Sequence, residues 1–324
     1  MSRPSASLAI RADGDARLGF GHVMRCAALA QALLDIGHRV CWFSQTPDIV
    51  PAGLAARIDI RPISVDGDEA APLISGLAAA GVSGLIGDWQ TTDPRLCAQL
   101  RRAGVWLALV GNHIGDAEAD LFIRQRFGPT SPDIPAVICD GSAHLLLAPG
   151  YAGLPARTIP PQVKRLLISL GGSETPILEC VLAALDGLHG LEGVTVDIKR
   201  ASPHATALPE TGLLDDLRAA DIAILGAGTT LHEAAATGLA AIALPIAANQ
   251  FERARQYESL GLGLSLDPAA EGFAPRLRQQ LTEVLRRPAM REQYSLAGQN
   301  AVDGRGAERV ARQVASLIAA PGPN

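Results

Sequence analysis

The chain has 324 residues, of which 48% are hydrophobic and 19% are charged, and its formal net charge is −5. This length suits two domains of ordinary size, and the acidic balance indicates no nucleic-acid partner. No apolar run reaches the roughly 20 residues that cross a bilayer, and residues 1–7 lack the layout of a signal peptide, so we expect a cytoplasmic protein without membrane insertion.

Short apolar runs alternate with longer amphipathic patterns along the first half of the chain. This rhythm is typical of βαβ units around a parallel sheet. The clearest helix covers 22–36, where apolar residues recur every three or four positions and Gly37 follows as a stop signal. The predicted elements are strand 8–11, helix 22–36, strands 39–43 and 58–63, helix 73–80, strand 84–88, helix 94–103, strand 105–110, and weaker strands 121–123 and 144–147.

Pro and Gly punctuate residues 149–161, the best linker in the sequence. This stretch predicts an N-terminal domain over 1–150 and a C-terminal domain over 151–324. The later elements are strand 165–170, helix 176–188, strands 194–198 and 222–225, helix 230–237, strand 241–245, and helices 250–260, 273–286 and 305–318. Both halves begin with a strand, a glycine-containing turn and a helix. The prediction is an α/β fold with two Rossmann-like domains whose parallel sheets face a central cleft.

The five cysteines are scattered and form no C-x-x-C pair: Cys26, Cys41, Cys97, Cys139 and Cys180. The spacing indicates neither a zinc site nor a disulfide framework. We expect reduced thiols at buried positions, and the sequence predicts no metal and no cofactor. It does not indicate an oligomeric state.

The first glycine turn reads Gly19-Phe20-Gly21-His22-x-x-Arg25 and opens the helix 22–36. Glycines let the backbone approach a ligand closely. His22 would lie at the helix N-terminus, where the dipole disfavours a second positive charge, so a neutral imidazole there could act as a general base. Arg25 lies on the same face of the helix. A His that only caps its own turn is the alternative.

Two aspartates, Asp13 and Asp15, precede this turn. Either carboxylate could orient His22 through a hydrogen bond, or both could be ordinary turn residues.

In the second half, a buried strand runs into Gly171-Gly172-Ser173 before a helix. Backbone amides of such a turn, including that of Gly172, can approach a phosphate. The Gly-Lys-Ser/Thr ending of a P-loop is missing, so the turn does not indicate an ATPase. A tight strand–helix connection is the alternative.

A stronger signal is the run Ala227-Gly228-Thr229-Thr230-Leu231-His232-Glu233, which follows a strand and opens a helix. Gly228 gives the backbone freedom, and Thr229 and Thr230 can cap the helix while offering donors to a diphosphate. Glu233 lies one turn further, where a carboxylate could accept both hydroxyls of a ribose. A capping box between Thr230 and Glu233 is a partial alternative.

Together these motifs resemble a known family in order and spacing, over residues 8–260. They are Ile10-Arg11-Ala12-Asp13, Gly19-x-Gly21-His22-x-x-Arg25, Gly171-Gly172-Ser173, Ala227-Gly228-Thr229-Thr230-x-x-Glu233 and Asn249-Gln250. The family is the UDP-2,4-diacetamido-2,4,6-trideoxy-β-L-altropyranose hydrolase of pseudaminic acid biosynthesis. It is related to GT-B glycosyltransferases and to predicted spore-coat polysaccharide glycosyltransferases.

This resemblance implies a GT-B fold and hydrolysis of a UDP-sugar at its anomeric carbon with inversion and without a metal. It makes His22 the general base that activates water. The residues that it and the turns assign to substrate binding are Asp13, Gly21, Arg25 and Asp88 on the sugar side, Gly172, Gly228, Thr229 and Thr230 on the diphosphate, Glu233 on the ribose, and Asn249 and Gln250 on the second-domain wall.

The sequence departs from the family in the first domain. The family carries Asp-His/Asn-Tyr-Gly where this chain has Asp88-Trp89-Gln90-Thr91, and a pair of aspartates where this chain has Gly111-Asn112. Two alternatives to the hydrolase therefore stay open: a GT-B glycosyltransferase in which the same base activates a saccharide hydroxyl, and a non-catalytic nucleotide-sugar binding protein.

Overall fold

The computed structural model describes residues 7–15, 19–65, 67–82, 84–111, 116–128, 137–171, 176–200 and 211–319. They form two compact units. The first contains the described residues up to 149 together with 211–212 and 305–319, and the second contains the described residues of 150–200 and 213–304. The last helix, α11 (Gly306–Ala319), thus belongs to the first unit, although the sequence placed all of 151–324 in the second domain.

The first unit is built around a seven-stranded sheet in the order β3-β2-β1-β4-β5-β6-β7, and every neighbouring pair is parallel. The strands are β1 (Ser7–Ala12), β2 (Arg39–Ser44), β3 (Asp59–Pro62), β4 (Gly84–Asp88), β5 (Trp106–Val110), β6 (Leu121–Ile123) and β7 (Val137–Cys139). The strand order reverses between β1 and β4. In open α/β sheets, ligands bind beyond the carboxyl ends of the strands at such a reversal.

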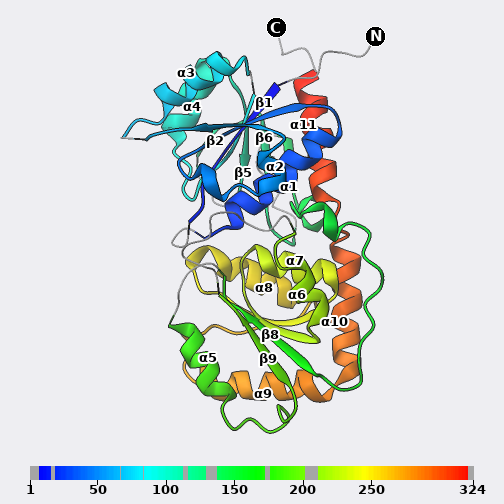
Figure 1. Cartoon of the computed structure of the whole chain (residues 1–324). Coiled ribbons are helices and arrows are strands. Elements are labelled where there is room, and N and C mark those ends of the chain that lie inside the picture. The colour runs from blue at the N-terminus through cyan, green and yellow to red at the C-terminus, as the bar shows by residue number, and fades with distance from the viewer. Residues whose placement is uncertain are drawn as a thin grey trace. The chain divides into compact units, whose positions relative to one another are not determined.

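Helices cover both faces of this sheet because alternate residues of each strand point to opposite faces. Leu8 and Ile10 of β1 pack in one core with α1 (Gly21–Asp35) and α11, which lie side by side in Figure 1. Ala9 packs in the other core with α3 (Ala70–Ala80) and α4 (Pro94–Arg102). The short elements are α2 (Ala52–Ala55) and the 3₁₀ turns η1 (Pro47–Ile49), η2 (Ser142–His144) and η3 (Pro149–Tyr151).

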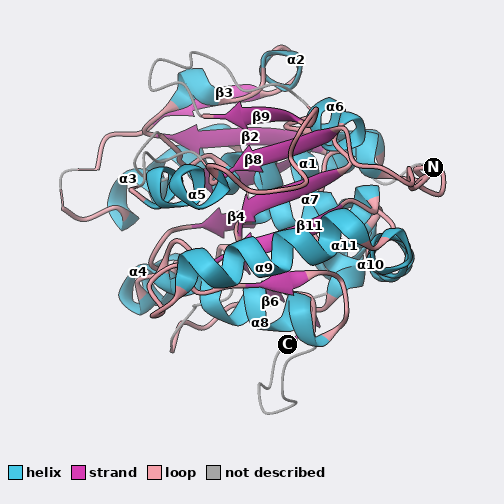
Figure 2. Cartoon of the chain, turned by 90° about the horizontal axis from the view of Figure 1, so that it is seen from below, coloured by secondary structure: helices cyan, strands magenta, loops and turns pink. Residues whose placement is uncertain are grey.

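The second unit contains a five-stranded parallel sheet in the order β12-β11-β10-β8-β9, with its reversal between β8 and β10. The strands, magenta in Figure 2, are β8 (Arg165–Ser169), β9 (Thr195–Lys199), β10 (Ile222–Gly226), β11 (Ala240–Leu244) and β12 (Leu264–Ser265). The helices are α5 (Ile177–Leu185), α6 (Leu214–Ala219), α7 (Thr229–Thr237), α8 (Phe251–Ser259), α9 (Phe273–Arg286) and α10 (Pro288–Ala301), with η4 at Ala248–Gln250.

The predicted α/β architecture with two parallel sheets is confirmed, and several details differ. The predicted strand 144–147 is wrong: this segment leaves the sheet, and the Leu146 N–H donates to the side chain of Gln125 at 3.0 Å. The last strand is β7 instead, which the sequence did not predict. Cys180 is exposed on α5, whereas the other four cysteines are buried as expected.

The helix α10 was also missed, because its apolar residues do not follow a clear helical period. It is held by close packing on α7, where a Cβ at Gly298 would lie 2.8 Å from the carbonyl oxygen of Ala235. Within the described part of the chain, no helix is long and apolar enough to cross a bilayer.

Candidate active site

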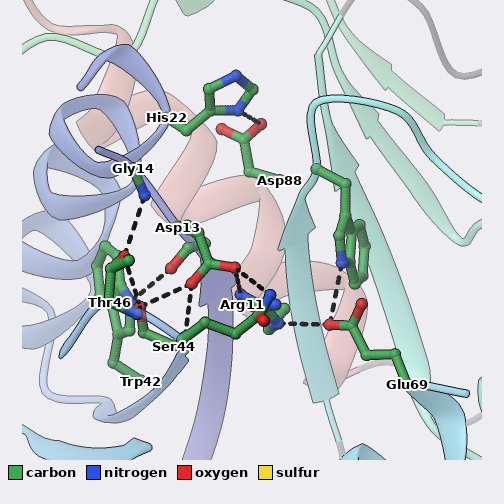
Figure 3. A network of polar contacts seen from close by, with 12 residues as sticks. Arg11, Asp13, Gly14, His22, Trp42, Ser44, Thr46, Glu69 and Asp88 are labelled. Atoms are coloured by element: carbon green, nitrogen blue, oxygen red, sulfur yellow. Dashed lines mark hydrogen bonds and ion pairs between the residues drawn. The ribbon is translucent and has the colours of Figure 1, made fainter. Parts of the chain in front are cut away.

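His22, Arg25 and Asp88 meet where the first sheet reverses its strand order. His22 is the second residue of α1 and Asp88 is the last residue of β4. The His22 Nδ1 atom lies 2.7 Å from Asp88 Oδ1, and a dashed line marks this contact in Figure 3. The guanidinium of Arg25 donates two hydrogen bonds to the same carboxylate, with Nε 2.5 Å from Oδ2 and Nη2 2.6 Å from Oδ1. The side chain of His22 thus bonds to a residue far away in sequence, so the alternative of a self-capping His is wrong.

The charge state of Asp88 fixes the proton on His22. Burial opposes ionisation of this carboxyl, but the charge of Arg25 and the bonds from His22 and Arg25 outweigh it and hold the pKa of Asp88 below its usual value. An ionised carboxylate only accepts hydrogen bonds. Nη2 of Arg25 also lies 3.0 Å from Nδ1 of His22, but the contact to the ionised carboxylate is shorter. The arrangement therefore favours the proton on Nδ1, which leaves Nε2 the lone pair that a general base needs.

The carboxylate of Asp13 bonds to the loop after β2 and not to His22. Its carboxylate accepts bonds from Ser44 Oγ at 2.8 Å and from the backbone N–H of Gln45 at 2.7 Å, and it pairs with Arg11 Nη1 at 2.5 Å. Burial raises the pKa of Asp13, but the charge of Arg11 and these bonds bring it below its usual value. Asp88, and not Asp13, therefore takes the orienting role that the sequence left open for Asp13 or Asp15.

These side chains line a cavity of about 260 Å³ within the first unit. Its described walls are Arg11, Asp13, His22, Gln45, Glu69, Asp88, Trp89, Gln90 and Thr91. The cavity brings together the predicted site residues His22, Asp13 and Asp88. Arg25 bonds to Asp88 but is not among the lining residues. Sequence reasoning gave no role to Gln45 or to the segment 89–91, although both directly follow strands at the edge where ligands bind. No sequence signal pointed to Glu69.

The second unit has a glycine turn at its own strand reversal. Gly226, at the end of β10, is so close to β8 that a Cβ there would lie 2.9 Å from the carbonyl oxygen of Leu170. Arg253 of α8 donates to the carbonyl of Ala227 at 2.7 Å and fixes the turn. Gly228 is the N-cap residue of α7, which begins at Thr229 and has no side-chain cap. The expectation that Thr229 or Thr230 caps this helix is therefore wrong, and so is the capping-box alternative.

Residues that follow β8 and β11 lie beside this turn. Gly171 follows β8 with φ +96°, a conformation that favours glycine. Gln250 accepts a bond from the N–H of Ile246 at 3.1 Å, and its Nε2 would lie 3.8 Å from a Cβ at Gly228. Asn249 is exposed. Gly172 and Asn112 lie outside the described residues, so the structure does not place them.

Glu233 occupies a nearly enclosed position on α7. It is 7% exposed, and the hydroxyl of Tyr151 donates a hydrogen bond to it. Burial is the main influence and raises the pKa of Glu233 to about 7. The predicted contact between Glu233 and a ribose stays a prediction.

The raised pKa of Glu233 predicts a pH-dependent stability difference for Glu233→Gln. In the unfolded chain the carboxyl loses its proton near 4.5, whereas in the folded protein it does so at about 7. Between these values the folded state binds more protons, so the free energy of unfolding of the wild type falls as pH rises. Above about pH 7 the folded protein bears the full cost of burying the ionised carboxylate. The amide carries no such penalty and can still accept from Tyr151.

We therefore expect Glu233→Gln to be more stable than wild type at about pH 8, by up to about 3 kcal/mol, and the difference to shrink toward pH 5. Urea unfolding at both pH values measures it. Glu118→Gln, whose carboxylate is 80% exposed, is the matched control and should show no such trend. If the free energies of unfolding of Glu233→Gln and wild type differed by the same amount at pH 5 and at pH 8, this would contradict the raised pKa of a buried Glu233.

Among the described residues, no group of three or more His, Cys, Asp or Glu side chains could hold a metal ion.

Comparison with known proteins establishes the fold. No family model matches the chain. The spore coat polysaccharide biosynthesis protein SpsG of Bacillus subtilis (strain 168) is 25% identical over 191 residues, which cover 53% of this chain and 56% of SpsG, so the chain matches about half the length of that relative. The calicheamicin glycosyltransferase CalG4 superposes with a TM-score of 0.66 at 15% identity, covering 99% of this chain and all of CalG4.

The spinosyn rhamnosyltransferase SpnG, complexed with thymidine diphosphate, superposes with a TM-score of 0.57 at 17% identity, covering 97% of this chain and all of SpnG. At such identities the likeness shows the fold alone. The chain therefore has the GT-B fold and a distant sequence relation to SpsG, and the hydrolase family named above remains a prediction.

Proposed function

We propose that this protein is an inverting glycosyltransferase that uses a nucleotide-diphosphate sugar as donor. The observation that carries the proposal is the His22–Asp88 pair, 2.7 Å apart, at the wall of a polar cavity. A carboxylate that holds one imidazole nitrogen as N–H leaves the other nitrogen as a base. In this proposal Asp88 is a positioning residue and His22 is catalytic.

The reaction needs one base. Nε2 of His22 takes the proton of an acceptor hydroxyl as its oxygen forms a bond to the anomeric carbon of the donor. The bond from that carbon to the diphosphate oxygen breaks, and the nucleoside diphosphate leaves with the electron pair. Attack opposite to the leaving group inverts the configuration at this carbon.

The glycine turn at residues 226–230 is the proposed diphosphate site. Backbone N–H groups at the start of a helix, together with the helix dipole, favour bound phosphate, and α7 begins here without a side-chain cap. Donors at the leaving diphosphate stabilise its developing charge. The structure of SpnG, which shares the fold, contains thymidine diphosphate. Uridine as the base is inferred from the family resemblance.

In the proposed transferase, the cavity beside His22 takes the saccharide acceptor. Its volume of about 260 Å³ is below the roughly 300–1,000 Å³ of typical ligand pockets, but it is several times the volume of one water molecule.

An assay of nucleotide release tests the proposal. The protein is incubated with UDP- and TDP-activated sugars, with and without a panel of saccharide acceptors, and free nucleoside diphosphate is measured. Release that depends on an acceptor supports the transferase. Equal release without acceptor identifies a hydrolase, and binding of nucleotide sugars without release identifies a non-catalytic binding protein.

Gly228→Ala is expected to weaken nucleotide binding without damage to the fold. Gly228 has φ −84°, which Ala adopts freely, and the nearest atom to the new Cβ is 3.8 Å away. The added methyl group would stand where the diphosphate approaches the backbone, so we expect UDP affinity to fall by at least about tenfold. Calorimetric titration with UDP measures this loss, and an unchanged melting temperature is the control. Wild-type affinity in the variant would remove this turn from the nucleotide site.

A further inference from the structure

Glu69 places an unused carboxylate oxygen at the cavity wall. Its Oε1 atom accepts two bonds, from Arg11 Nε at 2.5 Å and from Trp89 Nε1 at 3.2 Å, and Figure 3 shows Glu69 on the opposite side of Arg11 from Asp13. Its Oε2 atom has no bonding partner among the described residues. The side chain is only 14% exposed. A fixed carboxylate oxygen in this position can accept a hydrogen bond from a ligand hydroxyl.

Trp89 is held in place without a ligand. Its indole N–H is bonded to Glu69. Its six-membered ring packs directly on β4, because a Cβ at Gly87 would lie 1.7 Å from the ring atom Cζ3. Only glycine at position 87 permits this approach. The cavity therefore has a preorganised aromatic wall, the kind of surface on which apolar faces of ligands pack.

The charges of the wall indicate which ligands it accepts. The buried guanidinium of Arg11 lies between the carboxylates of Asp13 and Glu69, and the charge of Asp88 is balanced by Arg25. One negative charge is therefore in excess. A carboxylate or phosphate on the ligand would be repelled by this excess negative charge in a partly desolvated site, which opposes binding. Hydroxyl groups, which can donate to Glu69, meet no such penalty.

We propose that Glu69 and Trp89 form the recognition surface for one uncharged pyranose unit of the acceptor. The apolar face of the sugar ring packs on the indole, and one ring hydroxyl donates to Oε2 of Glu69. Both residues line the same cavity as His22 and so hold the sugar beside the base. They are specificity residues. This inference rests on the proposed transferase function, because that function makes the occupant of the cavity an acceptor.

Binding of simple glycosides without any nucleotide tests the inference separately from turnover. Saturation-transfer NMR is recorded on the full chain with methyl glucoside, methyl galactoside and methyl N-acetylglucosaminide, and with methyl glucuronide as the charged counterpart. We expect at least one uncharged glycoside to bind, and the glucuronide to bind at least about tenfold more weakly. Equal binding of the glucuronide, or no binding of any uncharged glycoside, would overturn the inference.

Two variants locate the binding. Glu69→Gln keeps an oxygen for Arg11 and Trp89 but removes the charge, and Trp89→Leu removes the aromatic wall. Each should weaken glycoside binding by about tenfold. Glu118→Gln and Trp106→Phe, which alter side chains outside the cavity lining, should leave it unchanged.

Wild-type binding in both Glu69→Gln and Trp89→Leu would overturn the inference even if the enzyme transfers sugars. A different outcome is glycoside binding that depends on both residues, without nucleotide release in the assay above. This outcome would refute the proposed function but support the sugar site.

Discussion

Replacing His22 with Asn should lower kcat by at least about 100-fold while nucleotide affinity stays within a factor of about two. Asn is similar in shape to one side of the imidazole and can donate to Asp88, but its amide is not a base. The acceptor hydroxyl then loses its proton without help, and the barrier of the chemical step rises. Nucleotide affinity is unaffected because the proposed diphosphate site lies on the second unit.

Steady-state release of nucleoside diphosphate and calorimetric titration with UDP measure the two quantities. His189→Asn is the matched control, since the side chain of His189 is 94% exposed on the second unit. Full activity in His22→Asn would exclude His22 as the base, and a parallel loss of nucleotide affinity would indicate a structural effect.

Replacing Asp88 with Asn should have two large effects. Without the carboxylate, the proton on the His22 ring is no longer held on Nδ1, and losing this kind of orientation costs about 10⁴ in kcat in a serine-protease triad. The buried Arg25 also loses its counter-charge, which destabilises the fold by about 3–5 kcal/mol. In wild type, the lowered pKa of Asp88 means that its stabilisation is present at neutral pH and is lost only as the pH falls through that value.

A double variant separates the two effects. Arg25→Met with Asp88→Asn removes both charges, so most of the stability measured by urea unfolding should return while kcat stays low. Recovery of kcat along with stability would show that Asp88 acts only through the fold.

The sequence predicted the elements that carry the site better than the contacts between them. His22 lies at the start of α1 as expected, and the resemblance already placed Asp88 on the sugar side. The bond between them spans 66 positions of sequence and depends on β4 lying next to β1. Strand order in a parallel sheet cannot be read from the order of strands in the chain, so only the nearer Asp13 and Asp15 were considered as residues that could orient His22.

The cavity wall was harder to predict for a similar reason. Arg11 reaches Glu69 because alternate residues of β1 face α3, and Trp89 lies on Gly87 two residues earlier in the chain. Both arrangements depend on side-chain packing across elements. The buried position of Glu233 also depends on such packing, because Tyr151 reaches it from the segment that the sequence indicated only as a linker.

The anomeric configuration of the first product tests the central claim most directly. A single base that activates an acceptor hydroxyl for direct displacement must invert the anomeric carbon of the donor. Proton NMR of the product, recorded before mutarotation or further reaction, should show the configuration opposite to that of the donor. Retention of configuration would require a second displacement and would contradict the role of His22 as the only base.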